Sequence, residues 1–206
     1  MTMTPSVLFD LSGKTALVTG GATGIGRMAT TGLMAAGARV LIASRKGEGC
    51  VAVSTELNSL GLSGTAEGFG GDVGSEIGIA KLCQDIAKRT DKLDILINNA
   101  GGQFTAPSNV IAQKGWAAVI NNNLNGTFYM CQHMANTFFI PQKKGTIINI
   151  TANVMRGFPG MAHTGAARAG VENLTKTLGQ EWAEHNIRVN AVAPGTIATS
   201  GLENYP

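Results

Sequence analysis

The segment Thr19-Gly20-Gly21-Ala22-Thr23-Gly24-Ile25-Gly26 decides the fold of this chain. It lies between a short apolar run, Thr15–Thr19, and a stretch of helical period, Ile25–Ala36. The first glycine permits a tight bend, and the later ones let backbone approach a phosphate and let a helix pack on a strand. The start of such a helix also presents unpaired N–H groups and a partial positive charge. The segment therefore predicts a dinucleotide-binding turn. Its predicted contacts are Gly20, Ala22, Thr23, Gly24, Ile25 and Gly26.

Outward from this turn, short apolar runs alternate with stretches of helical period. The predicted strands are Thr15–Thr19, Val40–Ser44, Ile95–Asn98, Thr146–Ile150 and Arg188–Val192, with Thr65–Gly70 as a weaker sixth. The predicted helices are Ile25–Ala36, Glu76–Arg89, Asn125–Phe138 and Gly165–His185. Strands that are apolar on both faces are typical of parallel strands covered by helices. The alternation predicts an α/β fold, a doubly wound, Rossmann-like parallel sheet with helices on both faces. We expect one domain over residues 1–206, with Gly61–Gly71 as a helix-to-strand connection.

Composition excludes several classes of function. Of the 206 residues, 44% are hydrophobic, which is enough to bury a core, and the net charge of +3 is scattered along the chain. Because there is no Lys/Arg run and no apolar run of membrane-spanning length, we expect neither a nucleic-acid partner nor a membrane span. The three cysteines lack metal-ligand spacing, so no metal site is predicted. Met1–Asp10 shows no secretory signal, and we expect a cytoplasmic protein.

The end of the second predicted strand indicates which dinucleotide binds. An acidic residue there usually contacts a free ribose 2′-hydroxyl, but this chain has Ser44-Arg45-Lys46. A cation at this place can bind a 2′-phosphate. The sequence therefore favours NADP(H) over NAD(H), although Arg45 and Lys46 could also be a solvated start of a helix.

With these residues in view, the chain resembles the short-chain dehydrogenase/reductase family. Further motifs carry the resemblance: Gly71-Asp72-Val73, Asn98-Asn99-Ala100-Gly101, Asn123 in Asn123–Thr127, and Pro194–Thr199. It implies that Asp72 and Val73 contact the adenine and that Asn123 is the active-site asparagine. The implied contacts to the adenosine ribose are Asn99, Ala100 and Gly101. The implied contacts to the nicotinamide carboxamide are Pro194, Gly195, Ile197 and Thr199.

The chain departs from the family at the catalytic positions. Family members carry Tyr-x-x-x-Lys, in which the phenol transfers the proton and the lysine holds the nicotinamide ribose. Here Thr164 stands at the tyrosine position, Arg168 at the lysine position, and Thr151 where a serine is usual. The hydroxyl pKa of threonine is too high for proton transfer near neutral pH, and arginine does not deprotonate to relay a proton. We expect Asn123, Thr151, Thr164 and Arg168 to position substrate and support an oxyanion, with Arg168 also binding the ribose.

One branch of the family tolerates such changes. Gly101–Phe104, Lys114–Trp116, Gly126–Cys131 and Gly165–Val171 are similar to trans-2-enoyl-CoA and 2,4-dienoyl-CoA reductases. Those enzymes reduce C=C bonds with NADPH, and the charge passes to a thioester oxygen that needs hydrogen-bond donors. Thr151, Asn153, Thr164 or backbone N–H groups could supply these donors. The resemblance therefore implies an NADPH-dependent reductase of an enoyl- or dienoyl-CoA.

Alternatives stay open for both the reaction and the proton donor. A carbonyl reductase or alcohol dehydrogenase of a 3-oxoacyl or acyclic terpenoid substrate is the second reading, and an inactive NADP(H)-binding fragment is the third. His163 is a candidate acid, or else a satisfied histidine beside a loop. Glu172 and Lys176 are expected to form a helix salt bridge rather than to act in catalysis. Of the two tyrosines, Tyr129 is expected to pack in the core, and Tyr205 could reach a substrate only if the tail folds back.

The chain ends soon after the sixth predicted strand, where family members continue. The resemblance therefore implies that a seventh, C-terminal strand, a substrate-loop region and part of the usual oligomer interface are missing from this stretch. Either a fragment or a shortened relative would explain this ending. We expect the full-length form to be a homo-oligomer, and a peroxisomal location if a C-terminal address follows.

Overall fold

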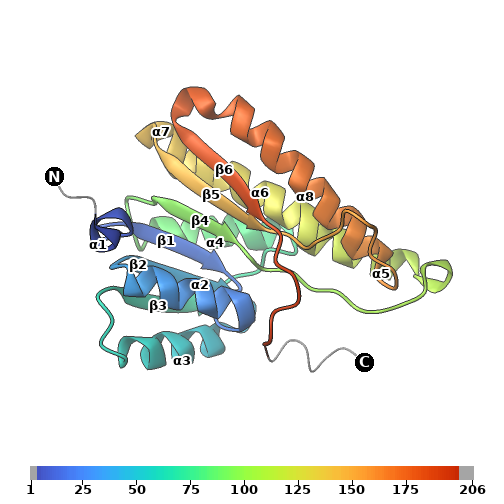
Figure 1. Ribbon diagram of the computed structural model, residues 1–206, viewed down its shortest axis with the longest axis horizontal. Coiled ribbons are helices and arrows are strands. Elements are labelled where there is room, and N and C mark those ends of the chain that lie inside the picture. The colour runs from blue at the N-terminus through green and yellow to red at the C-terminus, as the bar shows by residue number, and fades with distance from the viewer. Residues whose placement is uncertain (1–3, 200–206) are drawn as a thin grey trace.

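A computed structural model describes residues 4–199, and one parallel sheet runs through them (Figure 1). Its six strands are β1 (Thr15–Thr19), β2 (Arg39–Ser44), β3 (Thr65–Gly70), β4 (Ile95–Asn98), β5 (Gly145–Ile150) and β6 (Ile187–Val192). They lie in the order β3-β2-β1-β4-β5-β6, and every neighbouring pair is parallel. This order confirms the predicted doubly wound, Rossmann-like fold.

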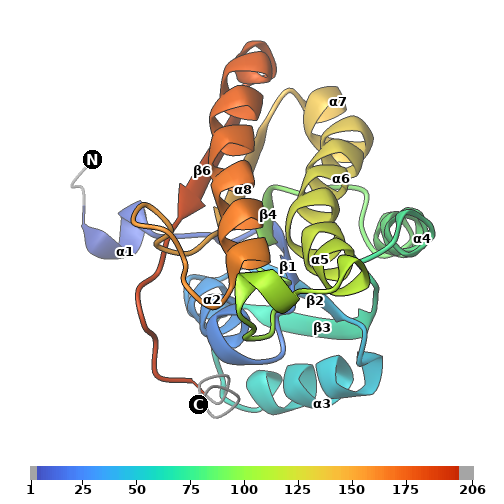
Figure 2. The ribbon, with the colours of Figure 1, turned by 90° about the vertical axis from the view of Figure 1, so that its right-hand side faces the viewer.

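Helices cover both faces of the sheet (Figure 2). They are α1 (Pro5–Leu8), α2 (Gly24–Ala35), α3 (Gly47–Asn58), α4 (Glu76–Ala87), α5 (Gln113–Ile120), α6 (Gly126–Met134), α7 (Ile140–Gln142) and α8 (Ala162–Glu181). Short 3-10 turns are η1 (Ser108–Val110) and η4 (Ala183–His185), and π-helical turns are η2 (Asn121–Asn125) and η3 (Ala135–Phe139). No helix in residues 4–199 is long and apolar enough to cross a membrane.

The alternating side chains of the strands divide the core into two clusters. Leu17 and Leu41 face α4, α6 and α8, whereas Val18 and Ile42 face α2 and α3. All five residues of β1 are buried because β1 lies inside the sheet and is covered on both sides. The sheet core therefore explains why these strands are apolar at consecutive positions.

Four helices differ from the prediction. α3 was not predicted because Gly47 and Gly49 lie in its first turn and its apolar period is weak, and α1, α5 and α7 were not predicted because they are short. Gly61–Gly71, expected as a connection, contains all of β3, which was also predicted as the weaker sixth strand. A Cβ at Gly68 would lie 2.0 Å from the Cys50 carbonyl oxygen, so glycine there lets α3 pack directly on β3.

The carboxylate of Asp94 joins the amino ends of β1 and β4. It accepts a hydrogen bond from the Thr15 backbone N–H at 3.0 Å and forms ion pairs with Lys14 at 3.3 Å and Lys92 at 3.2 Å. Burial acts to raise the pKa of Asp94, but the Thr15 bond and the two lysines outweigh it, so the pKa lies below its ordinary value. The ionised carboxylate therefore stabilises the folded state.

Asp94→Asn is expected to lower the free energy of unfolding at pH 7 by about 1–2 kcal/mol, because the amide loses these charged bonds. Since the folded pKa is depressed, the contribution is present above about pH 4, the pKa of an unfolded aspartate, and disappears as the pH falls through the folded pKa. Urea denaturation of both proteins measures it. A difference between them that does not shrink on acidification would contradict the assignment.

Candidate active site

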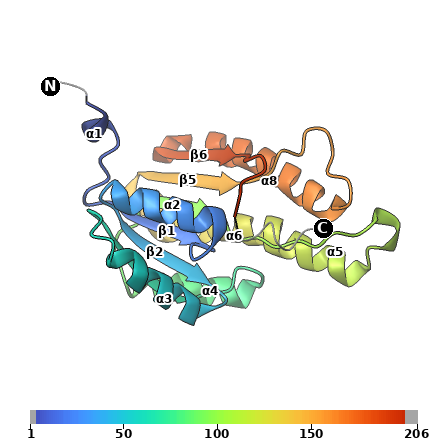
Figure 3. The same cartoon turned by 60° about the horizontal axis from the view of Figure 1, so that its bottom comes forward.

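The carboxyl ends of the strands form one edge of the sheet, where the loop after β4, α5 and the loop before α8 extend past it (Figure 3). The strand order reverses between β1 and β4, which is where open α/β sheets bind ligands. Asn99 connects these two strands, since its Nδ2 donates to the backbone oxygens of Thr19 at 3.0 Å and Gly20 at 3.2 Å. Thr19 Oγ1 accepts in return from the N–H groups of Asn99 and Ala100. This bonding fixes the end of β1 to the end of β4 at the crevice.

The glycine turn has the conformation that its residues predict. Gly20 (φ +65°) and Gly24 (φ +51°) lie in the left-handed region that favours glycine. A Cβ at Gly26 would lie 2.2 Å from the Gly20 carbonyl oxygen, so only glycine allows α2 to pack this close to the turn. Thr23 is exposed at the start of α2, and its side chain, within the described part of the chain, makes no capping bond. The first N–H groups of α2 are therefore suited to a pyrophosphate.

A cavity of about 660 Å³ lies beside the turn, at the ends of β1, β2 and β4. Eleven predicted cofactor residues line it: Gly20, Ala22, Thr23, Ser44, Arg45, Lys46, Asp72, Val73, Asn99, Ala100 and Gly101. Five further lining residues were not predicted as cofactor contacts: Ala43, Gly49, Val53, Gly71 and Asn122. Gly71 belongs to the quoted Gly71-Asp72-Val73 motif, and nothing in the local pattern of the other four indicates a ligand. The residues that line the cavity fit the adenosine half of a dinucleotide, and Arg45 and Lys46 are the cations among them.

The other predicted cofactor residues lie around this cavity. Ile25 and Gly26 belong to the first turn of α2. Gly24 and Thr199 line a second cavity of about 520 Å³ along the outer side of α2. Pro194, Gly195 and Ile197 lie on the segment that follows β6 and leads to Thr199.

Gly101, Asn123 and Arg168 come together from three separate elements. A Cβ at Gly101 would lie 2.3 Å from Arg168 Nη2 and 2.7 Å from Asn123 Oδ1, so both side chains close on this glycine. The π-helical turn η2 carries Asn123, whose Nδ2 donates to the Gly102 carbonyl at 2.7 Å. Asn123 Oδ1 is buried and has no hydrogen-bond partner within residues 4–199. This unpaired acceptor lies against Gly101, which lines the crevice.

Arg168 supplies a buried positive charge next to this acceptor. Its side chain is 7% exposed, and Nη1 donates to the Ile150 carbonyl at 2.7 Å. Burial lowers the pKa of Arg168 to about 10, so the guanidinium is still protonated near neutral pH. Among the described residues it has no acidic partner. Its remaining N–H groups can therefore donate hydrogen bonds to a ribose hydroxyl or to an anionic oxygen.

The two threonines of the predicted triad are placed differently. Thr164 is buried one helical turn before Arg168, and its Oγ1 lies 3.1 Å from His163 Nδ1. Thr151, at the end of β5, has its hydroxyl directed to the Val192 carbonyl of β6 at 3.3 Å. To donate to a substrate, Thr151 must give up this bond. Asn153 is exposed on the following loop.

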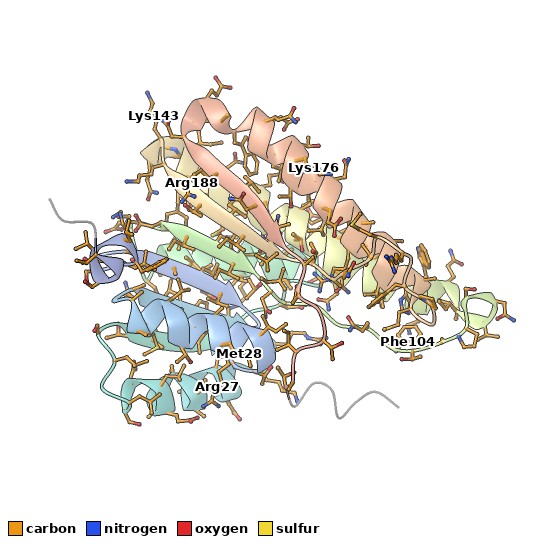
Figure 4. All side chains as sticks on the ribbon, viewed as in Figure 1. Arg27, Met28, Phe104, Lys143, Lys176 and Arg188 are labelled. Atoms are coloured by element: carbon orange, nitrogen blue, oxygen red, sulfur yellow. The ribbon has the colours of Figure 1, made fainter. Side chains whose placement is uncertain are left out.

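The remaining candidates have separate outcomes. Tyr129 packs on the core beside Phe128, as expected, and Tyr205 lies outside the described residues. The predicted salt bridge between Glu172 and Lys176 is wrong, since within residues 4–199 these two side chains form no ion pair. Lys176 points outward from α8 (Figure 4). The electrostatic energy of an exposed ion pair is too small to offset the side-chain entropy lost when two long side chains are held together.

Comparison with known proteins agrees with this geometry. The family model described as short chain dehydrogenase matches residues 14–205. A probable 2,4-dienoyl-CoA reductase of Bacillus subtilis (strain 168) is 35% identical over 91% of this chain and 74% of its own length. A 3-oxoacyl-acyl-carrier-protein reductase of Thermotoga maritima is 36% identical over 95% of this chain and 79% of its own length.

A solved structure from Pseudomonas aeruginosa, described as an RhlG/NADP active-site complex, superimposes with a TM-score of 0.86. It is 32% identical, and the match covers 98% of this chain and 78% of that one. The family match spans the sheet, the glycine turn and the residues around Gly101. The chain therefore belongs to the short-chain dehydrogenase family and is an oxidoreductase.

Proposed function

We propose that this protein reduces the C=C bond of a fatty enoyl- or dienoyl-CoA, with NADPH as the reductant. The observation that carries the proposal is the set of groups around the substrate position. Thr164 replaces the usual phenol, and Arg168 is a donor that stays protonated near neutral pH. Such a site stabilises negative charge on an oxygen but does not offer a phenolic proton.

Reduction of an enoyl thioester suits a site with these hydrogen-bond donors and no phenol. When bound, NADPH supplies the hydride that adds to the β-carbon. The electrons of the C=C bond then move to the thioester oxygen, which becomes an enolate, and the α-carbon takes a proton from water. In this proposal Thr164 and Arg168 support the enolate oxygen and the ribose, and Asn123 Oδ1, which is unpaired within residues 4–199, accepts a hydrogen bond from a hydroxyl. A ketone, in contrast, would form an alkoxide that needs an acid at the oxygen itself.

The preference for NADP(H) follows from Arg45 and Lys46 at the adenosine cavity. Arg45→Ala is expected to weaken NADPH binding by about 10–100-fold, because charge-assisted bonds to a 2′-phosphate are lost. NADH, which lacks this phosphate, should bind Arg45→Ala about as well as it binds the unmutated protein. Fluorescence titration with each cofactor measures both affinities.

Lys176→Ala is the matched control, since it removes one exposed cation from the outer side of α8. It should leave both affinities unchanged. Equal weakening of NADPH and NADH by Arg45→Ala would show that Arg45 does not read the 2′-phosphate.

A carbonyl reductase acting on a 3-oxoacyl or acyclic terpenoid substrate is the second candidate. The Thermotoga maritima relative favours it, because its name assigns 3-oxoacyl reduction at an identity close to that of the dienoyl-CoA reductase. Parallel assays with crotonyl-CoA and acetoacetyl-CoA separate the two. Turnover of acetoacetyl-CoA alone would overturn the proposal, and NADPH binding without turnover of either substrate would indicate a non-catalytic NADP(H)-binding protein.

A further inference from the structure

His163, the second residue of α8, is buried beside Thr164, and the proposed reaction gives it no role. Its side chain is 0% exposed. Nδ1 accepts a hydrogen bond from the Thr164 backbone N–H at 2.8 Å and contacts Thr164 Oγ1 at 3.1 Å. Nε2 is buried and has no hydrogen-bond partner within residues 4–199.

The Thr164 bond determines where the imidazole carries its proton. Since Nδ1 accepts an N–H, it has no proton of its own, and a neutral ring must carry its proton on Nε2. Burial also lowers the pKa of His163, which agrees with a neutral ring. His163 was a candidate acid beside Thr164, but the available N–H points away from Thr164. His163 thus presents a fixed donor, and buried donors in folded proteins nearly always have an acceptor.

Phe104 packs against the imidazole ring of His163. The two rings meet edge to face, with centroids 4.4 Å apart and an angle of 71° between them. Figure 4 shows Phe104 on the loop after β4, beside the N-terminal end of α8. The Phe104 side chain is 40% exposed. The backbone is hydrogen-bonded on both sides of Phe104: the Gly102 carbonyl accepts from Asn123, and the Ala106 N–H donates to the Gly160 carbonyl. The phenyl ring also packs on Gly115 of α5, and it must leave that contact to rotate away, but neither backbone bond has to break.

We propose that His163 Nε2–H donates a hydrogen bond to the carbonyl oxygen of the substrate once that substrate displaces the Phe104 ring. The inference rests on the proposed function, and it adds a catalytic donor and a steric gate to that site. His163 precedes Thr164, and Arg168 follows Thr164 by one helical turn, so all three lie along one end of α8. The substrate class is then a carbonyl compound whose oxygen gains negative charge, as a thioester oxygen does during C=C reduction.

Two substitutions separate the two nitrogens of the ring. His163→Asn places an amide oxygen near Nδ1, which still accepts the Thr164 N–H, but it has no group at the position of Nε2. His163→Gln reaches the position of Nε2 with an N–H donor. We expect kcat for crotonyl-CoA to fall about 100-fold in His163→Asn, the usual effect of removing one oxyanion donor, and to fall only a few-fold in His163→Gln. Equal kcat in His163→Asn and the unmutated protein would overturn the proposal.

A measurement on the unmutated protein keeps the test independent of how the variants fold. The chain has three histidines, so imidazole ¹⁵N resonances can be resolved and assigned. We expect the free protein to show His163 protonated at Nε2, and this resonance to shift when NADP⁺ and crotonyl-CoA bind together. An unchanged Nε2 resonance in the ternary complex would mean that the ring contact with Phe104 is its only interaction, and the proposal fails.

The failure of this inference is distinguishable from that of the proposed function. If the protein turns over acetoacetyl-CoA but not crotonyl-CoA, C=C reduction is wrong, and the same His163 comparison is made on the acetoacetyl-CoA complex. A shift of Nε2 there supports the donor role for a ketone oxygen. If neither carbonyl ligand moves the resonance, His163 is not a substrate donor, whichever reaction the protein catalyses.

Discussion

Gly26→Ala is expected to abolish useful dinucleotide binding, with an NADPH affinity at least about 100-fold weaker and an unfolding free energy lower by about 2–3 kcal/mol. The added Cβ would lie 2.2 Å from the Gly20 carbonyl oxygen and 2.5 Å from Asn99 Nδ2. Neither atom can move aside, because the hydrogen bonds from Asn99 to Thr19 and Gly20 connect β1 to β4. The start of α2 must therefore shift away from the turn that binds the pyrophosphate. Fluorescence titration with NADPH and urea denaturation measure the two effects.

Gly32→Ala is the matched control, since Gly32 lies later in the same helix. Within the described residues, a Cβ at Gly32 meets no atom closer than 4 Å. Alanine in the middle of a helix is favoured over glycine, so Gly32→Ala should raise the unfolding free energy by about 0.5–1 kcal/mol and leave NADPH affinity unchanged. Normal NADPH binding by Gly26→Ala would show that the turn does not hold the cofactor.

Arg168→Met is expected to have opposite effects on activity and on stability. Loss of the guanidinium should lower kcat about 100-fold or more, because the ribose and the enolate oxygen lose a charged donor. The cofactor-free protein, however, should gain about 1 kcal/mol of unfolding free energy, or about 3 °C in Tm, because a buried charge without an acidic partner is replaced by an apolar chain. Steady-state kinetics and thermal denaturation test both expectations.

The pH dependence of this gain follows from the pKa of Arg168, which burial lowers to about 10. A cation with a depressed folded pKa destabilises the folded state at every pH below that value. The advantage of Arg168→Met should therefore be constant from neutral pH to about pH 10, because the guanidinium keeps its proton over this range. Arg168→Lys, which keeps a cation, should show no such gain. A large drop in Tm for Arg168→Met would mean that the charge is already compensated in the fold.

The fold could be predicted from local pattern because buried parallel strands leave a strong signal. All six strands have apolar or β-branched residues on both faces, and the predicted bounds agree with the observed ones to within one residue. The glycine turn was predictable for a related reason, since the positive φ at Gly20 and Gly24 and the close approach at Gly26 each exclude a side chain. α3 was missed because its helical state depends on packing against β3, which its own residues do not reveal.

Some features of the candidate site could likewise be predicted from local sequence, and others depend on contacts between distant segments. That Thr164 and Arg168 stand in the place of tyrosine and lysine could be read from the sequence, and so could Arg45 and Lys46 after β2. The closure of Asn123 and Arg168 on Gly101, the bond from Thr151 to Val192 and the Nε2 proton of His163 could not. The pattern of residues along one segment indicates which of its side chains are buried and which are exposed. The identity of a hydrogen-bond partner and the burial of a charge depend on contacts between segments that are distant in the sequence. Those contacts form only when the chain folds.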